Sequence, residues 1–305
     1  MKIAFFGTSD RSTPILDTLN ASFDLVLCIT KRDEKVGRKQ ELKETQVKSW
    51  AKANEVDYFE INSMKEDVAQ IVEEIRSKGI ELGVMADFGF IIPKALIDVF
   101  PKGIINIHFS KLPQHRGASP VQFALLNGDD KTSITYYLMD ESMDTGDILS
   151  QYEYKIGKDD TSESLYRFLF QKAGENVAEV VSKYVSGELY PLPQDDTLAT
   201  YTYSRTNPKR TLVYKEDARI DWNEPHEKIE RLIRAYYPWP IAWTDLQELI
   251  KGLGLNIKNV SQGKLLVKIY KAKLQNGKLE IERIQAEGKQ IISWEEFKNG
   301  YLAVS

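Results

Sequence analysis

Residues 103–117 read Gly-Ile-Ile-Asn-Ile-His-Phe-Ser-Lys-Leu-Pro-Gln-His-Arg-Gly. The apolar run 104–107 is typical of a buried strand, and Asn106 and His108 lie two positions apart at its end. Side chains two positions apart on a strand point to the same face. We therefore expect an amide and an imidazole to leave one strand together, just before a loop marked by Pro113 and Gly117.

The chain on either side of this stretch predicts an α/β fold. Apolar runs at 3–6, 25–29 and 82–86 predict strands, and apolar residues at helical spacing in 68–75 predict a helix between them. Such alternation indicates a Rossmann-like, mostly parallel sheet. Gly7 closes the first strand without a Gly-x-Gly-x-x-Gly pattern, so a tight turn is favoured over a dinucleotide site.

The second half of the chain changes character. Residues 161–184 predict a long helix, and the Pro-rich segment 188–209 then breaks the pattern. After a helix at 225–235, the runs 265–271 and 278–284 flank Asn276-Gly277, which predicts a hairpin. We expect an α/β domain at 1–189, a linker at 190–208, and a smaller β-rich, OB-like barrel domain at 209–305.

Composition limits the functional classes. The 305 residues are 42% hydrophobic, which is ample for a core, but no window approaches the roughly 18 apolar residues of a membrane span. With no signal peptide at the start, we expect a cytoplasmic protein that makes no membrane contact. Cys28 is the only cysteine and is expected to be buried and inert. Three histidines make a zinc site improbable, and His115 and His226 are expected on the surface.

Charge is distributed unevenly along the chain. Residues 205–305 carry 18 Lys+Arg and 13 Asp+Glu, a net +5; the rest carries 41 − 18 = 23 basic and 45 − 13 = 32 acidic residues, a net −9. A basic C-terminal third is compatible with binding a polyanion, and equally with a well-solvated domain. Residues 31–48 form a polar insertion with seven basic and four acidic residues, either a solvated loop or a substrate-binding one.

Two acidic residues stand at predicted strand ends. Asp87 follows the strand at 82–86 and opens a Gly turn, whose exposed backbone groups suit a flat heterocycle. Asp144 precedes a Gly turn before the apolar residue Ile148. Alone, Asp144 would be read as a local turn cap, but the turn follows the stretch that carries Asn106 and His108.

These segments together resemble the signature of the methionyl-tRNA formyltransferase family. The resemblance rests on Asn106-Ile107-His108, on residues 110–120, and on Asp144-Thr145-Gly146-Asp147, in that order. The Phe-Gly-Thr start at 6–8, the basic insertion and the Arg-Ala-Tyr-Tyr-Pro-Trp-Pro segment at 234–240 extend it over the chain. The sequence departs from the family pattern at Phe109, at Lys111 and at residues 87–88.

The resemblance implies transfer of a formyl group from 10-formyltetrahydrofolate to the α-amine of methionine on initiator tRNA, for translation initiation, without a metal. It implies that Asn106 and His108 donate hydrogen bonds to the formyl oxygen, and that Asp144 accepts the amine proton and orients His108. Arg116 is expected to brace the loop. The expected folate contacts are Asp87, Phe88, Gly89, Ile91, Ser110, Leu112 and Pro113, and the expected tRNA contacts are Lys35, Arg38 and Lys39.

Two other functions remain open on the sequence. One is an N-formyltransferase that acts on a nucleotide-linked amino sugar, and the other is a catalytically silent folate- or RNA-binding module. The long linker and the basic C-terminal third favour tRNA over the sugar, because phosphate contacts supply affinity for tRNA. The presence of Asn106, His108 and Asp144 argues against a silent module. We expect a monomer, and we expect the Pro-Trp-Pro segment to pack in the core of the smaller domain rather than stack on RNA.

Overall fold

The computed structural model describes residues 1–36, 41–255 and 265–302, with the backbone alone described at 34–36 and 41. The chain forms two compact units, and each is assembled from separate stretches of sequence. The first unit contains Met1–Arg116, Thr132–Tyr154 and Tyr166–Thr200, and the second contains Gly117–Lys131, Lys155–Leu165 and Tyr201–Ser305. The contiguous boundaries at 189 and 208 stay a prediction.

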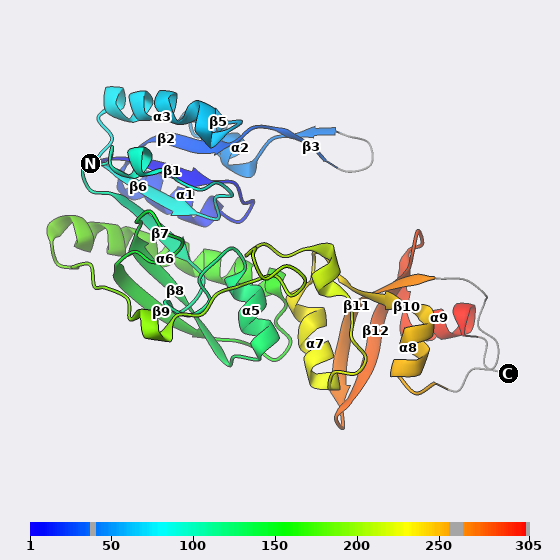
Figure 1. The fold of residues 1–305 in the computed structure, drawn as a ribbon. Coiled ribbons are helices and arrows are strands. Elements are labelled where there is room, and N and C mark those ends of the chain that lie inside the picture. Colours follow the sequence, from blue (N-terminus) through cyan, green and yellow to red (C-terminus); the bar gives the residue numbers. More distant parts are fainter. Residues whose placement is uncertain (37–40, 256–264, 303–305) are drawn as a thin grey trace. The chain divides into compact units, whose positions relative to one another are not determined.

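The first unit is built on a seven-stranded sheet in the order β5-β2-β1-β6-β7-β8-β9 (Figure 1). Pairs from β5 to β7 are parallel, and β7 pairs with β8 in the antiparallel sense, so the predicted mostly parallel α/β fold is confirmed. The strands are β1 Lys2–Gly7, β2 Asp24–Lys31, β5 Asp57–Ile61, β6 Leu82–Ala86, β7 Ile104–His108, β8 Lys131–Leu138 and β9 Ile148–Lys155.

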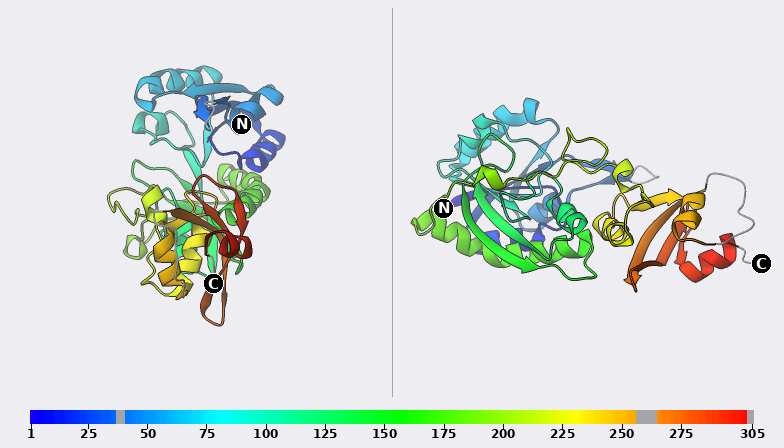
Figure 2. Two further views of the ribbon diagram at one scale, coloured as in Figure 1. Left: turned by 90° about the vertical axis from the view of Figure 1, so that its right-hand side faces the viewer. Right: turned by 60° about the horizontal axis from the view of Figure 1, so that its bottom comes forward.

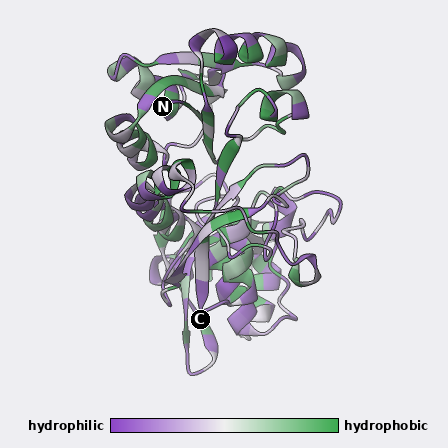
Figure 3. Ribbon diagram, turned by 90° about the vertical axis from the view of Figure 1, so that its left-hand side faces the viewer, coloured by the Kyte–Doolittle hydropathy of each residue, from purple (hydrophilic) through white to green (hydrophobic). Residues whose placement is uncertain are grey.

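Helices cover both faces of this sheet. The alternate residues Ala4 and Phe6 of β1 face α3 and α4, and Gly174 of α6 lies against Pro14 of α1 on the other side. Figure 3 shows apolar strands and helices of mixed hydropathy, as expected where one helix face is buried. The helices are α1 Thr13–Ser22, α2 Gln46–Ala53, α3 Met64–Lys78, α4 Lys94–Ile97 and α6 Ser162–Ser186. Among the described residues no helix is both long and apolar enough to cross a membrane.

Strand order fixes where this sheet can bind a ligand. The chain passes from β1 outward to β2 and β5, then returns to β6 on the other side of β1. The carboxyl ends of β1 and β6 therefore flank a topological switch point, the place where open parallel sheets bind ligands. β7 is the next strand beyond β6, so its last residues reach the same edge.

Cys28 lies in β2 and is completely buried, as the sequence predicts. Burial raises the pKa of its thiol to about 12, so the reactive thiolate is scarce near neutral pH. We expect no labelling by Ellman's reagent in the folded protein at pH 8, and one thiol per chain after unfolding in guanidinium chloride. Rapid labelling of the native protein would contradict this burial.

Within the basic insertion, β3 Glu34–Val36 and β4 Glu41–Lys43 pair as a two-stranded arm, which extends from the sheet (Figure 1). Lys48 anchors its base: the buried ammonium contacts Asp33 at 2.8 Å and Glu60 at 2.9 Å. The hydrogen bond to Asp33 contributes most to holding the pKa of Lys48 above its usual range. The arm is thus tied to the sheet by an ion triad.

The second unit contains a four-stranded antiparallel sheet in the order β10-β11-β12-β13. The β11–β12 hairpin, orange in Figure 2, turns at Asn276-Gly277 as predicted. Among the described residues the sheet is open, so the β-rich prediction is confirmed while closure into an OB-like barrel is not seen there. The elements are α5 Pro120–Asn127, η2 Lys215–Ala218, α7 His226–Ala235, β10 Ala242–Asp245, α8 Leu246–Gly252, β11 Leu266–Gln275, β12 Lys278–Ala286, β13 Ile291–Ser293 and α9 Trp294–Tyr301.

The aromatic segment after α7 only partly follows its prediction. Tyr236 is buried in the core of the second unit, but the side chain of Trp239 is 61% exposed. The expectation that the whole Pro-Trp-Pro segment packs in the core was therefore wrong for Pro238 and Trp239, which are both exposed, whereas Pro240 is buried.

Candidate active site

β7 carries Asn106 and His108 to the edge of the sheet. Both side chains are buried, and the antiparallel register places Asn106 opposite Tyr137 and His108 opposite Thr135 on β8. Residues directly opposite on one face are close enough to bond. The two polar side chains predicted from the sequence thus lie beside Tyr137 and Thr135, which each carry a hydroxyl group.

Tyr137 links Asn106 to Asp144. Asn106 Nδ2 donates to Tyr137 Oη at 2.8 Å, and Tyr137 Oη donates to Asp144 Oδ1 at 2.7 Å. Burial raises the pKa of Tyr137 well above its ordinary value, and the charge of Asp144 adds to the shift. The phenol therefore stays protonated and serves as a donor. Tyr137 was not predicted from the sequence, where its only signal is a tyrosine pair in the strand before the Asp144 turn.

His108 lies between a backbone carbonyl and the same carboxylate. Its Nε2 is 3.0 Å from the carbonyl oxygen of His115, and its Nδ1 is 3.8 Å from Asp144 Oδ2. Because a carbonyl oxygen can only accept, Nε2 must carry a proton, and Nδ1 is the nitrogen that faces the carboxylate. The structure thus brings Asn106, His108 and Asp144 together through residues on three different segments.

The turn that carries Asp144 requires unusual backbone geometry. Asp144 has φ +57°, a left-handed conformation that aspartate and asparagine adopt more readily than most residues. Two residues later, a Cβ on Gly146 would collide with the carbonyl oxygen of Leu138. The Asp-Thr-Gly-Asp motif is explained by these two constraints, which aim the Asp144 carboxylate at Tyr137 and His108.

The first four predicted folate contacts lie at the switch point. The carbonyl of Asp87 accepts hydrogen bonds from the Thr8 amide at 3.2 Å and the Thr8 hydroxyl at 2.8 Å, which joins the loops after β1 and β6. The Phe88 ring packs edge-on against Phe6 with 5.5 Å between centroids. Gly89 and Ile91 are exposed, Ile91 by 89%. This turn therefore has an exposed surface at Gly89 and Ile91, and the packing of Phe88 against Phe6 supports it from below.

The other three lie in the loop after β7. Ser110 and Leu112 are buried, whereas Pro113 is half-buried. The Ser110 hydroxyl donates to the Gln114 carbonyl, and the Ser110 carbonyl accepts from Thr135 Oγ1 at 2.6 Å. Ser110 and Leu112 hold the shape of the loop, and their contact with folate stays a prediction.

Two further residues near this loop are buried. His115, expected on the surface, is only 8% exposed. Its carbonyl accepts a hydrogen bond from His108 Nε2, and its amide donates to Thr200 Oγ1 at 2.8 Å, so the residue is held inside the protein. Phe109, which departs from the family pattern, packs against Phe170 of α6 with 4.4 Å between ring centroids. It fills the side of β7 opposite the polar residues, so this departure leaves the polar cluster intact.

The predicted tRNA contacts Lys35, Arg38 and Lys39 belong to the basic insertion of the sequence. Lys35 is placed by its backbone in β3, whereas Arg38 and Lys39 lie outside the described residues. Their contact with tRNA stays a prediction. Within the described ranges no group of three or more His, Cys, Asp or Glu residues is arranged to hold a metal ion.

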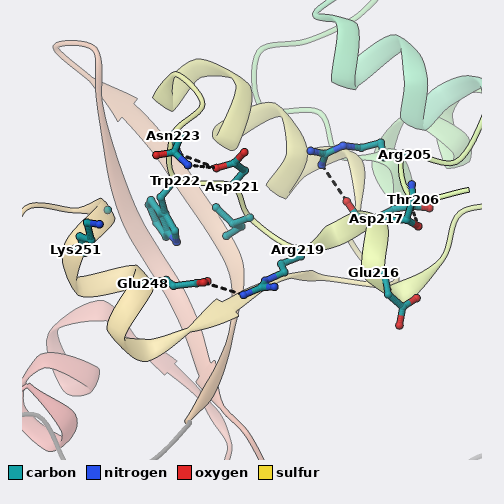
Figure 4. Close-up of a pocket in the computed structure, with 12 residues that line it drawn as sticks. Arg205, Thr206, Glu216, Asp217, Arg219, Asp221, Trp222, Asn223, Glu248 and Lys251 are labelled. Carbon is teal, nitrogen blue, oxygen red and sulfur yellow. Dashed lines mark hydrogen bonds and ion pairs between the residues drawn. The ribbon is translucent and has the colours of Figure 1, made fainter.

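A separate cavity of about 660 Å³ lies in the second unit (Figure 4). Arg219, Trp222 and Lys251 line it, together with several acidic residues. Arg219 already pairs with Glu248 at 2.8 Å. Because positive and negative groups alternate around it, this cavity does not form a uniformly positive surface of the kind that attracts polyanions.

Known proteins share both parts of this chain. A family described as formyl transferase matches residues 1–181, and one described as formyl transferase, C-terminal domain, matches residues 212–302. A methionyl-tRNA formyltransferase of Marinobacter nauticus is 36% identical over 81% of this chain and 77% of that protein. One of Thermodesulfovibrio yellowstonii is 33% identical over 98% of this chain and 95% of that protein.

Solved structures share the fold. A methionyl-tRNA formyltransferase from Clostridium thermocellum covers 96% of this chain and 99% of its own, with a TM-score of 0.57 and 19% identity. An N-formyltransferase from Helicobacter canadensis, in complex with folinic acid and dTDP-3-aminofucose, covers 96% of this chain and 98% of its own, with a TM-score of 0.62 and 20% identity.

The sheet, the polar cluster at its switch edge and these matches define a formyl-group transferase, and the chain belongs to the formyltransferase family. Within that family, relatives that match nearly the full length of this chain at 30–33% identity include methionyl-tRNA formyltransferases. The family resemblance that the sequence motifs carried is thereby confirmed.

Proposed function

We propose that this enzyme transfers the formyl group of 10-formyltetrahydrofolate to the α-amino group of methionine on initiator tRNA, acting as a monomer in the cytoplasm. The observation that carries the proposal is the hydrogen-bonded cluster of Asn106, Tyr137 and Asp144, with His108 against the same carboxylate. Relatives named for this activity match both the sheet unit and the C-terminal part.

The cluster has the groups that formyl transfer to an amine requires. As the amine attacks, negative charge gathers on the formyl oxygen, and fixed donors in a buried site stabilise it. Tyr137 uses one amide hydrogen of Asn106, and the second can be donated to that oxygen. His108 can be the second donor when its Nδ1 carries a proton, and this nitrogen lies 3.8 Å from Asp144 Oδ2.

Asp144 is the proposed proton acceptor. The attacking amine becomes cationic and must lose a proton, which Asp144 can take directly or through a water molecule. Its side chain is 11% exposed, so it is mostly shielded yet reachable from outside. Tyr137 fixes one carboxylate oxygen by donating to it, which leaves the other oxygen facing His108.

The turn after β6 fits the donor. A Cβ built on Gly89 meets nothing within 4 Å, and the neighbouring Ile91 is exposed, so a flat ring has room to approach the backbone there. We propose that Asp87, Phe88, Gly89 and Ile91 hold the pterin part of the folate. When bound, 10-formyltetrahydrofolate supplies an activated formyl group.

One assay tests the proposed function. The purified protein should formylate methionyl initiator tRNA in the presence of 10-formyltetrahydrofolate, measured as formylmethionyl-tRNA. An equimolar nucleotide-linked amino sugar serves as the competing acceptor, because the structural relative from Helicobacter canadensis is bound to one. Turnover of the sugar without turnover of the tRNA would refute the proposed acceptor, and absence of both would point to a binding module.

The basic insertion allows a prediction about the affinity of the protein for tRNA. Neutralising Arg38 and Lys39 together by alanine should weaken tRNA binding and make its salt dependence shallower, by about 0.7–0.9 in the log-log slope for each lost phosphate contact. The control removes the exposed Lys65 and Arg76 of α3, an equal change in net charge. The measurement is filter binding of tRNA at several salt concentrations. Equal losses of tRNA affinity in the two double variants would refute a specific role of the basic insertion.

A further inference from the structure

The segment that the sequence identified as a linker is bonded to both halves of the candidate active site. We call residues 192–200 the strap. Leu192 pairs with Ile148, the first residue of β9, through two backbone hydrogen bonds of 2.8 and 2.9 Å. Ile148 comes four residues after Asp144, so the strap enters the site beside the turn that carries the proposed proton acceptor.

Gln194 clamps that turn. Its Nε2 donates to the carbonyl of Asp144 at 2.9 Å and to the carbonyl of Gly146 at 2.8 Å. Both hydrogens of the amide are thus used on the backbone of the turn. Because Asp144 has a left-handed backbone and Gly146 lies directly against Leu138, fixing these carbonyls fixes the direction of the Asp144 side chain.

Arg116 holds the clamp itself in place. Its guanidinium donates to Gln194 Oε1 from Nε at 3.2 Å and from Nη2 at 2.8 Å, and Nη2 also contacts Asp196 at 2.6 Å. The Arg116 side chain is only 2% exposed, so the expectation that it braces a loop is confirmed. A buried guanidinium oriented by two partners orients the Gln194 amide in turn.

The far end of the strap contacts the loop residues next to His108, the other side chain with a proposed catalytic role. Thr200 Oγ1 accepts from the His115 amide at 2.8 Å, and the Thr200 carbonyl accepts from the Arg116 amide at 2.8 Å. His115 has φ +57°, and its carbonyl is the group that fixes the Nε2 proton of His108. Thr200 therefore holds the residue that sets the tautomer of His108.

We propose that the strap positions the catalytic pair, with Gln194 acting on Asp144 and Thr200 acting on His108 through His115. This inference rests on the catalytic roles proposed above for Asp144 and His108. No strap residue needs to touch the substrate. The strap instead joins two turns that are more than 25 residues apart in sequence. One turn carries Asp144, and the other contains His115, which holds His108. The Asp144 and His108 side chains must meet at one formyl carbon.

The first test replaces Gln194 with glutamate, which keeps the shape and the contact with Arg116 but removes both donors to the turn. We expect kcat to fall about ten- to thirty-fold, the loss of two hydrogen bonds, with KM for both substrates unchanged and the protein still folded at the assay temperature. The control is Gln70→Glu on the exposed surface of α3, which should behave as wild type.

A double-mutant cycle separates positioning from a general structural role. In an Asp144→Asn background, Gln194→Glu should slow the enzyme less than about two-fold further, because its effect passes through the missing carboxylate. An equal effect in both backgrounds would overturn the proposal, and so would a wild-type kcat for Gln194→Glu when Asp144→Asn is slow. Failure of the catalytic assignment looks different: Asp144→Asn would itself keep the wild-type kcat.

Thr200 allows a second, independent test of the proposal. Thr200→Val removes the acceptor at nearly constant volume and should lower kcat about five-fold, whereas Thr200→Ser keeps the hydroxyl and should restore it. In a His108→Ala background, Thr200→Val should have no further effect. Valine and serine variants with the same kcat would show that the hydroxyl has no positioning role.

Discussion

Asp144→Asn is expected to slow formyl transfer by roughly 10²- to 10⁴-fold, the range in which a positioned general acid or base contributes to catalysis. Asparagine has the same shape as aspartate, and its side-chain oxygen can still accept from Tyr137 at the position of Oδ1. It also tolerates the left-handed backbone at φ +57°. The variant therefore removes the charge and the proton acceptor and little else.

The measurements are single-turnover formylation rates and folate binding by fluorescence titration. We expect the rate to fall while folate affinity stays within a small factor of wild type. Asp147→Asn is the matched control, because it makes the same change at an exposed position of the same turn. If Asp144→Asn and Asp147→Asn turned over equally fast, the proposed proton acceptor would be wrong.

Asn106→Ala is expected to lower kcat by about 10²- to 10³-fold, equivalent to about 3–4 kcal/mol, which is the cost of removing one donor to a developing oxyanion. Asn106 is 8% exposed, and among the described residues its side chain donates to Tyr137 alone, so its second amide hydrogen can face the reacting formyl oxygen. Alanine removes both hydrogens, and water does not replace a donor fixed in a buried site without reorganisation.

Tyr137→Phe distinguishes direct from indirect action of Asn106. It keeps the ring in the core and removes the hydroxyl that joins Asn106 to Asp144. We expect a loss of only about five- to thirtyfold, the cost of two hydrogen bonds of about 0.5–1 kcal/mol each. Equal losses in Asn106→Ala and Tyr137→Phe would show that Asn106 works only by holding Tyr137.

Much of the fold could be predicted from local patterns. The apolar runs of β1, β2 and β6, the helical spacing in α3 and the Asn276-Gly277 turn are each encoded within a few residues, because strand, helix and turn have different periods and turn chemistries. Prediction failed where exposure depends on distant neighbours. His115 is buried by contacts with His108 and Thr200, and Trp239 is exposed although Tyr236 and Pro240 in the same segment are buried.

The sequence by itself determined that Asn106 and His108 share a face, that Asp144 belongs with them, and that the chain is a formyltransferase, since these depend on spacing and motif order. Only the tertiary structure decided that Tyr137 joins Asn106 to Asp144, and that Gln194 and Thr200 reach the same site. The reason is physical. Strand register and contacts between residues tens of positions apart depend on the packing of the whole sheet, and a register slip of one residue would turn Tyr137 to the opposite face.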